Sequence, residues 1–461
     1  MKVKIVAVGW ILILLAITGC ARFQRVDLNP AQLYQDFNSR SLDSSELKKF
    51  IENQTGQTNI NWPLPGWNFQ HLALAGLFYN PSMETARLEI KSAESAIITA
   101  GARPNPTISP LGGINKTSLG QDGVNPWLPA LDVQIPIETA NKRGFRIAVA
   151  SNRVEIAKLN LHSVAWQIRS NIKSICIELL SAQSRSNILQ TQIKLLEKIR
   201  SSMETQLDAG EIKASEVTPS IIAIANAEIE LSDAVKQYNE SLPQLATAIG
   251  VPARSVRSVN IQLGFNYNTN LLNYFLSSNA VERALKTRPD ILSKLYEYEA
   301  AQAALQLEIA KQYPDIVIGP GYEWDQGEHK WRLGLTIDIP IFNRNQGPIA
   351  EARANRDLAA AKFNEVQIKA ISEMEEALAA ANTAIEQLKR VQALQVIKEK
   401  HLRDLEAQLK AGVIDSLVLE HARIDLISIE KPLIEAYINW EKALARLESA
   451  FYHPLESLVT K

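Results

Sequence analysis

The chain has 461 residues, and its 49 basic side chains almost balance its 50 acidic ones, which gives a formal net charge of −1. Binding to nucleic acid calls for a strongly basic balance or patch, so we expect no nucleic-acid partner. The chain contains two cysteines, Cys20 and Cys176. If Cys20 is covalently modified, Cys176 is the one thiol left and no intramolecular disulfide can form.

The start of the chain has the pattern of a bacterial lipoprotein signal. Two lysines precede an apolar run over 5–17, which ends in Thr18-Gly19-Cys20 and resembles a lipobox. The run is shorter than the ~18 apolar residues expected of a helix that spans a membrane. We therefore expect residues 1–19 to be a signal peptide and Cys20 to carry the lipid. By resemblance to lipoprotein sorting, Ala21 after the cysteine favours the outer membrane.

Residues 20–66 are polar and contain three prolines, so we expect a tether with one short helix near 44–51. The first half of the chain then alternates helix and strand patterns. Its last helix pattern ends at Gly250 and Pro252, since glycine and then proline end a helix. The expected elements are a helix over 81–103, strands over 107–116 and 131–137 around a loop, one helix over 138–207, a turn, and a helix over 215–249.

The same order recurs about 205 residues later, which indicates an internal two-fold repeat. We expect a first repeat over 67–252, a linker or small flank over 253–278, a second repeat over 279–454 and a tail over 455–461. The matched pairs of segments are Asn80-Pro81 with Arg288-Pro289, Pro106 with Pro314, Ile135-Pro136-Ile137 with Ile339-Pro340-Ile341, Leu207 to Gly210 with Leu409 to Gly412, and Pro252 with Pro454.

One stretch in the second repeat, 331–341, alternates strictly between apolar and polar residues and predicts a strand that crosses a membrane. A tilted strand needs about 9–11 residues to do so, with its other face toward water. The apolar face consists of Trp331, Leu333, Leu335, Ile337, Ile339 and Ile341.

A very long helix is expected directly after Asn345. Its apolar residues follow the alternating three-and-four spacing of a coiled-coil seam. The seam consists of Ile371, Met374, Leu378, Ala381, Ile385 and Leu388. A helix of this length exceeds an ordinary globular core, so we expect the long helices to pack side by side, against each other and against partner chains.

These elements predict an α+β membrane protein with a long α-helical coiled-coil barrel continuous with a transmembrane β-barrel. Four strands cannot close a barrel, and an open edge in lipid leaves backbone groups unpaired, so the chain must supply part of a barrel that several chains share. A tube of this kind implies transport. We find no nucleophile elbow, phosphate loop or convincing ligand cluster, so we expect no enzyme, cofactor or metal site.

The chain closely resembles the TolC-type outer-membrane efflux family over residues 67–454, through the repeat, the Ala-Gly turns and the Ile-Pro-Ile strand ends. The resemblance implies a homotrimer with a twelve-stranded barrel, extending from the outer membrane into the periplasm. It also implies a periplasmic adaptor (membrane fusion) protein and an inner-membrane pump, most naturally of the RND type, as partners.

Residues 339–347 resemble the heavy-metal-exporting branch of that family, so metal cations are the expected substrate. Multidrug efflux and a type I protein-secretion duct remain open alternatives. A purely structural coiled-coil lipoprotein would explain the helices and Cys20, but it would leave the alternating strands without a role.

In that family the turns furthest from the outer membrane form the gate and the adaptor-docking surface, which correspond to 207–217 and 409–419 here. Rings of carboxylates in a trimer favour cations and repel one another. The candidates are Asp208, Gly210, Glu211, Glu216, Gly412 and Asp415. His401 and His421 flank the second turn, but two histidines without a third ligand make a poor metal site.

Overall fold

The computed structural model describes residues 21–57, 60–115, 126–265, 271–277, 279–325, 327–414 and 416–455. The predicted signal peptide, the predicted lipid site Cys20 and the gate candidate Asp415 therefore lie outside the described residues. The chain divides into a small N-terminal unit that ends at Ser41 and a large unit that begins at Leu42.

The described part of the small unit, 21–41, contains one helix, α2 (Pro30–Ser39), which was not predicted from the sequence. Asn29 begins the helix, because its Oδ1 accepts hydrogen bonds from the backbone N–H groups of Ala31 and Gln32. Pro30 fits the first helical position, where no backbone donor is needed.

The tether predicted over 20–66 is wrong beyond Ser41, because the large unit already begins there. Helix α3 (Ser45–Thr55) is capped by Ser44, whose Oγ accepts from the N–H of Leu47 at 3.2 Å. Leu47 and Ile51 lie four residues apart on one helical face, and both are fully buried, as is Leu42. These three apolar side chains are enough to hold the segment against the core of the large unit, although the overall composition of the segment is polar.

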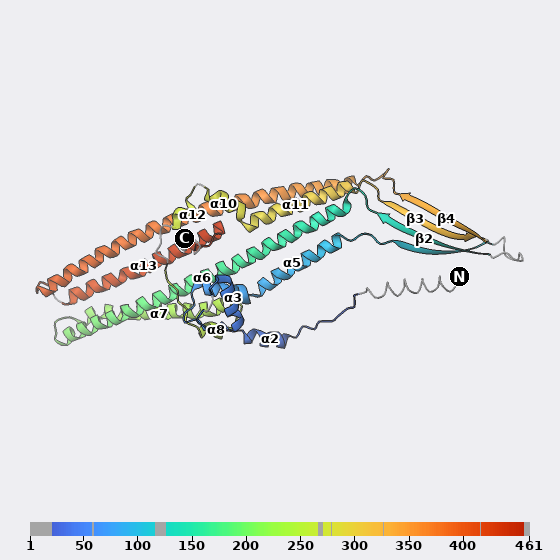
Figure 1. Cartoon of the computed structure of the whole chain (residues 1–461). Helices are drawn as coiled ribbons and strands as arrows, with labels where there is room; N and C mark the ends of the chain where they lie inside the picture. The colour runs from blue at the N-terminus through green and yellow to red at the C-terminus, as the bar shows by residue number, and fades with distance from the viewer. Residues whose placement is uncertain are drawn as a thin grey trace. The chain divides into compact units, whose positions relative to one another are not determined.

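Each repeat has the predicted order of short helix, two strands, long helix and shorter helix, and one further short helix, α4 or α10, precedes this series. Figure 1 shows the strands at one end of the large unit and the α6–α7 and α12–α13 connections at the other. The first repeat comprises α4 (Phe69–Tyr79), α5 (Pro81–Ala100), β1 (Thr107–Ile114), β2 (Trp127–Ile137), α6 (Lys142–Asp208) and α7 (Ala214–Ile249). The second comprises α10 (Ala280–Thr287), α11 (Pro289–Ala310), β3 (Ile316–Asp325), β4 (Glu328–Ile337), α12 (Gln346–Lys410) and α13 (Ser416–Phe451).

The long helices are continuous, as predicted: α6 has 67 residues and α12 has 65. At 1.5 Å per residue each is about 100 Å long. Both begin at an asparagine in the left-handed conformation, Asn141 (φ 58°) and Asn345 (φ 60°), at the point where a strand turns into a helix. Asparagine tolerates this conformation better than most residues, so the two repeats use the same local device.

Two apolar cores lie about halfway along the long helices, one on α6 and one on α12. In the second repeat, the coiled-coil seam residues Met374, Ala381 and Leu388 are buried against α13, around the fully buried Trp440. In the first repeat, α3, α4, α6 and α7 form the corresponding core, which contains Cys176. Burial raises the pKa of the Cys176 thiol to about 12, so this cysteine is an inert apolar residue.

The segment 253–278 is more than a linker in its described parts. It contains α8 (Ala253–Arg257) and α9 (Leu271–Phe275), and Val256 and Phe275 are almost fully buried. Between them the chain runs beside Trp67, whose N–H donates to Asn260 O at 2.8 Å.

The four strands form one antiparallel sheet in the order β1-β2-β3-β4. The predicted strand over 331–341 is correct in its alternation and wrong in its bounds, because β4 begins at Glu328 and stops at Ile337. Ile337 pairs with Ile316, the first residue of β3, so no partner strand extends further. Ile339 and Ile341 therefore lie beyond the strand, in a turn where the N–H of Ile341 donates to Ile339 O around Pro340.

Candidate functional site: the sheet, its junction with the helices, and the hairpin ends

The sheet has one apolar face and one polar face. Strand register places Ile135, Ile318 and Leu335 in one row, and Leu131, Tyr322 and Trp331 in another. Trp331 and Leu333 are 80% and 78% exposed, so nothing in the described chain covers this face. Large apolar side chains exposed in rows over a whole sheet face mark a surface that meets lipid or another chain.

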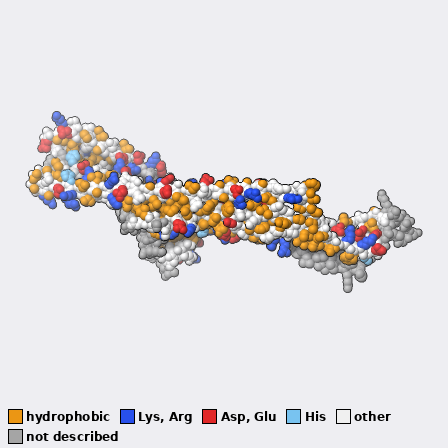
Figure 2. Space-filling view, turned by 90° about the horizontal axis from the view of Figure 1, so that it is seen from above, with side chains coloured by type: hydrophobic (Ala, Val, Ile, Leu, Met, Phe, Trp, Pro, Cys, Tyr) orange, Lys and Arg blue, Asp and Glu red, His pale blue; other side chains and the backbone are white. Residues whose placement is uncertain are grey.

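The polar face carries charged side chains from three strands. Arg332 on β4 lies 3.3 Å from Asp132 on β2 and 3.8 Å from Glu323 on β3. Lys330 pairs with Asp325 at 2.5 Å. Basic and acidic side chains gather on the strand-bearing end of the face shown in Figure 2. The predicted alternation is confirmed within β4, because this register places Arg332 and Thr336 on the face opposite Leu335.

Both edges of the sheet are open in the described part of the chain, because β1 and β4 each pair with one neighbour. Unpaired edge strands present rows of N–H and C=O groups that need partners. The apolar face and the two open edges together mean that a single copy of this sheet is incomplete.

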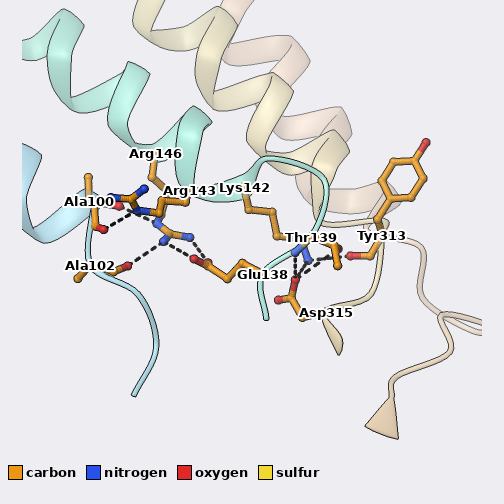
Figure 3. Close-up of polar contacts among 10 residues, drawn as sticks. Ala100, Ala102, Glu138, Thr139, Lys142, Arg143, Arg146, Tyr313 and Asp315 are labelled. Atoms are coloured by element: carbon orange, nitrogen blue, oxygen red, sulfur yellow. Dashed lines mark hydrogen bonds and ion pairs between the residues drawn. The ribbon is translucent and has the colours of Figure 1, made fainter. Parts of the chain in front are cut away.

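The connection from strands to helices is held by a buried lysine that joins the two repeats (Figure 3). Lys142, at the start of α6, is 8% exposed, and its Nζ donates to Asp315 Oδ1 and to Tyr313 O, both at 2.7 Å. The N–H of Thr139 also donates to Asp315, at 2.9 Å. Burial alone would raise the pKa of Asp315, but these donors outweigh it and the pKa is lowered.

Two arginines hold the end of α5 against the same junction (Figure 3). Arg143 donates to Gly101 O at 2.6 Å and Arg146 to Ala100 O at 3.2 Å, so both satisfy carbonyls at the helix end. Arg146 also forms a two-point ion pair with Glu138, and its hydrogen bonds are the main reason that the pKa of Glu138 is lowered. These residues were not predicted from the sequence, although Lys142, Arg143 and Arg146 form a visible basic cluster shortly after Ile-Pro-Ile.

The two helix–helix turns have the same backbone geometry. Gly210 (φ 74°) and Gly412 (φ 72°) both adopt the left-handed conformation, which favours glycine. Their N–H groups donate to Leu207 O and Leu409 O, at 2.9 and 3.0 Å. The repeat symmetry read from the sequence therefore extends to individual hydrogen bonds.

The acidic candidates at these turns differ in their surroundings. Asp208 and Glu211 are exposed. Glu216 is also exposed, but its Oε1 accepts from the N–H of Lys213 at 3.1 Å and so caps α7, a role that the sequence analysis missed. A glutamate in the first turn of a predicted helix is the signal that could have found it.

The histidines form no metal site among the residues the structure describes, where no group of three or more His, Cys, Asp or Glu side chains could hold an ion. His401 and His421 are exposed. Strands β3 and β4 contain a further histidine, His329, together with Glu323, Asp325 and Glu328. His329 Nδ1 is hydrogen-bonded to the Tyr322 hydroxyl at 2.8 Å.

Within the described ranges, none of the helices combines the length and the apolar composition that crossing a lipid bilayer requires.

Comparison with known proteins shows where this architecture recurs. The family model for "Outer membrane efflux protein" matches residues 76–251 and 280–451. The cobalt-zinc-cadmium resistance protein CzcC of Cupriavidus metallidurans is 26% identical over 373 residues, which covers 80% of this chain and 85% of that protein.

Solved structures share the fold. The outer membrane protein VceC of Vibrio cholerae superposes with a TM-score of 0.65 at 18% identity, over 84% of this chain and 96% of VceC. A structure of CusC, whose title refers to transmembrane channel formation, superposes with a TM-score of 0.64 at 16% identity, over 95% of this chain and all of CusC.

Proposed function

The chain belongs to the outer membrane efflux protein family, and we propose that it forms, as a homotrimer, the outer-membrane channel of a tripartite efflux system that exports metal cations. Matches to the family in both halves of the chain support the channel assignment. The relation to a cobalt-zinc-cadmium resistance protein over 80% of the chain supports metal cations as the substrate.

The structural observation that carries the proposal is the sheet, which has an exposed apolar face, a charged face and two open edges. The smallest single-chain membrane barrels have eight strands, so four strands cannot close alone. Three copies would join β1 of one to β4 of the next and close a ring of twelve strands. The apolar face would then contact lipid and the charged face would line the pore.

The aromatic residues of the apolar face support a membrane position for this ring. Four aromatic residues lie near the end of the sheet that is furthest from the helices: Trp127, Tyr322, Trp324 and Trp331. Aliphatic residues such as Ile318 and Leu335 lie nearer to the helices. Tyrosine and tryptophan gather at the level of lipid headgroups. In this arrangement the aromatic end faces outward, and the helices of about 100 Å extend into the periplasm.

The exposed turns then lie at the periplasmic end, where an adaptor protein and an inner-membrane pump, of the RND type in this proposal, would deliver the substrate. Asp208, Gly210, Glu211, Glu216, Gly412 and Asp415 remain our candidates for the gate and the docking surface. Acylation of Cys20 would add an anchor in the outer-membrane lipid.

Gene deletion tests the proposal. A deletion strain should accumulate zinc, cobalt or cadmium when challenged with each ion, and the wild-type gene should restore export. Retention of a drug dye, measured in the same strains, tests multidrug efflux. Raised dye retention with unchanged metal content would show that the substrate is an organic compound and not a metal cation. No change in either quantity would contradict efflux as the function.

Assembly is tested separately from transport. Chemical cross-linking of outer membranes should give a three-chain product. A product limited to monomers and dimers would contradict the twelve-stranded ring, whatever the substrate.

A further inference from the structure

The charged residues of the sheet's polar face are confined to one end of it. From Pro136, Val317 and Thr336 at the helix end up to Gln134 and Gly334, the described polar face carries no charge. All its charges fall in three successive rows at the far end, next to the β3–β4 turn. These residues are Asp132, Glu323, Asp325, Glu328, Lys330 and Arg332.

One arginine organises this end of the face. Asp132, Gly321 and Arg332 occupy one row on β2, β3 and β4, so the ion pair between Asp132 and Arg332 passes over Gly321. A Cβ at Gly321 would lie 2.4 Å from Asp132 Oδ1 and 3.7 Å from Arg332 Nε. The missing side chain therefore leaves the space through which the charges of β2 and β4 meet.

The charges do not cancel, because four carboxylates face two basic groups. Lys330 and Arg332 are held against Asp325, Asp132 and Glu323, and these ion pairs are partly exposed, with the Arg332 side chain at 53%. These six residues form a charged band with a net negative charge in each copy, and removing either basic side chain would make that charge more negative.

We propose that this charged band is an electrostatic filter at the outer mouth of the pore, in which Arg332 limits the cation selectivity that Asp132 and Glu323 create. The inference rests on the proposed function, because the face becomes a pore lining only when the sheet closes into a ring. Three copies then place twelve carboxylates and six basic groups around the mouth, a field that attracts cations. Arg332 weakens that field enough for a cation to leave instead of staying bound.

Planar-bilayer recordings of the full-length protein under a KCl gradient test the filter. Arg332→Gln should raise the K⁺/Cl⁻ permeability ratio by about twofold or more, the effect of a unit charge about 8 Å from an ion in water. Asp132→Asn combined with Glu323→Gln should lower the ratio. Thr336→Gln, on the uncharged part of the same face, is the matched control and should leave the ratio unchanged.

Arg332 also ties three strands together, so its loss can affect assembly. Glu328→Gln tests the filter without this effect on assembly, because it removes a negative charge of the band and leaves the ion pairs of Arg332 and Lys330 intact. This variant should also lower the permeability ratio. Channels that open normally in all variants with an unchanged ratio would overturn the filter and leave Arg332 a structural role. A wild-type protein that forms no conducting channel would instead contradict the proposed function itself.

Discussion

Arg288 donates a hydrogen bond from Nη1 to the carbonyl oxygen of Ala450 at 2.7 Å, and this contact joins the start of α11 to the end of α13. The first repeat makes the same connection with a different residue, since Asn80 Nδ2 donates to Ala248 O at 2.8 Å. Each donor residue precedes the proline that opens a helix. The two repeats thus preserve one contact with side chains of different length and charge.

Arg288→Met should destabilise the protein by about 2–3 kcal/mol, because it leaves a buried carbonyl without a donor and removes the partner of Asp290 and Glu373. This loss of stability is smaller than that expected for a fully buried ion pair, because the two carboxylates are partly exposed. Arg446→Met, which breaks the exposed pair with Glu376, should cost about 0.5 kcal/mol or less. Thermal unfolding of the purified variants measures both, and equal losses would contradict the role given to Arg288.

Leu335→Arg should reduce assembly in outer membranes, because a basic side chain at the middle of the bilayer costs about 2–4 kcal/mol. Thr336→Arg places the same charge on the opposite face and should be tolerated. The yield of trimers on unheated gels gives the comparison. Similar yields for the two variants would argue against the lipid-facing assignment.

Cys20→Ser should abolish acylation and leave the precursor unprocessed by the lipoprotein signal peptidase. Export should largely persist, because in our proposal the strands also hold the protein in the membrane. Incorporation of labelled palmitate into wild type and variant is the measurement, and label in the variant would exclude Cys20 as the lipid site.

Asp208→Asn combined with Glu211→Gln should weaken cation selectivity at low salt and raise the conductance. Three copies of each carboxylate would surround the periplasmic end, and their field is screened over about 10 Å at 0.1 M salt. Reversal potentials in planar bilayers test this. An anion-selective wild type, or a double variant with both properties unchanged, would remove these residues from the gate and leave Glu216 and Asp415 as candidates.

Glu448 should make stability depend on acid pH. Its carboxylate is 1% exposed and accepts from Arg169 Nη2 at 3.0 Å, from Lys173, and from the N–H of Leu455 at 2.6 Å. Burial alone would raise its pKa, but these charges and donors outweigh it, so the folded-state pKa lies below the unfolded value.

The stabilisation from Glu448 is therefore complete above the unfolded-state pKa and is lost as pH falls through the lower folded-state value. Glu448→Gln should lower the melting temperature at neutral pH, and the difference from wild type should shrink below about pH 4. Melting curves between pH 7 and pH 3 follow the difference. A gap that stays constant over this range would show that protonation of Glu448 is not involved.

Features that depend on local spacing are predictable from the sequence: the alternation in β4, the seam of α12, the glycine turns and the two-fold repeat. A period of two or of about three and a half assigns each residue to a face whatever it packs against. The end of β4 depends on the tertiary structure, because a strand ends where its partner strand ends. Ile337 pairs with Ile316, and Ile316 is the first residue of β3. The tertiary structure also decided that Leu42 is core and that Arg332 meets Asp132, because burial and ion pairs between residues far apart in the chain depend on strand register and helix packing.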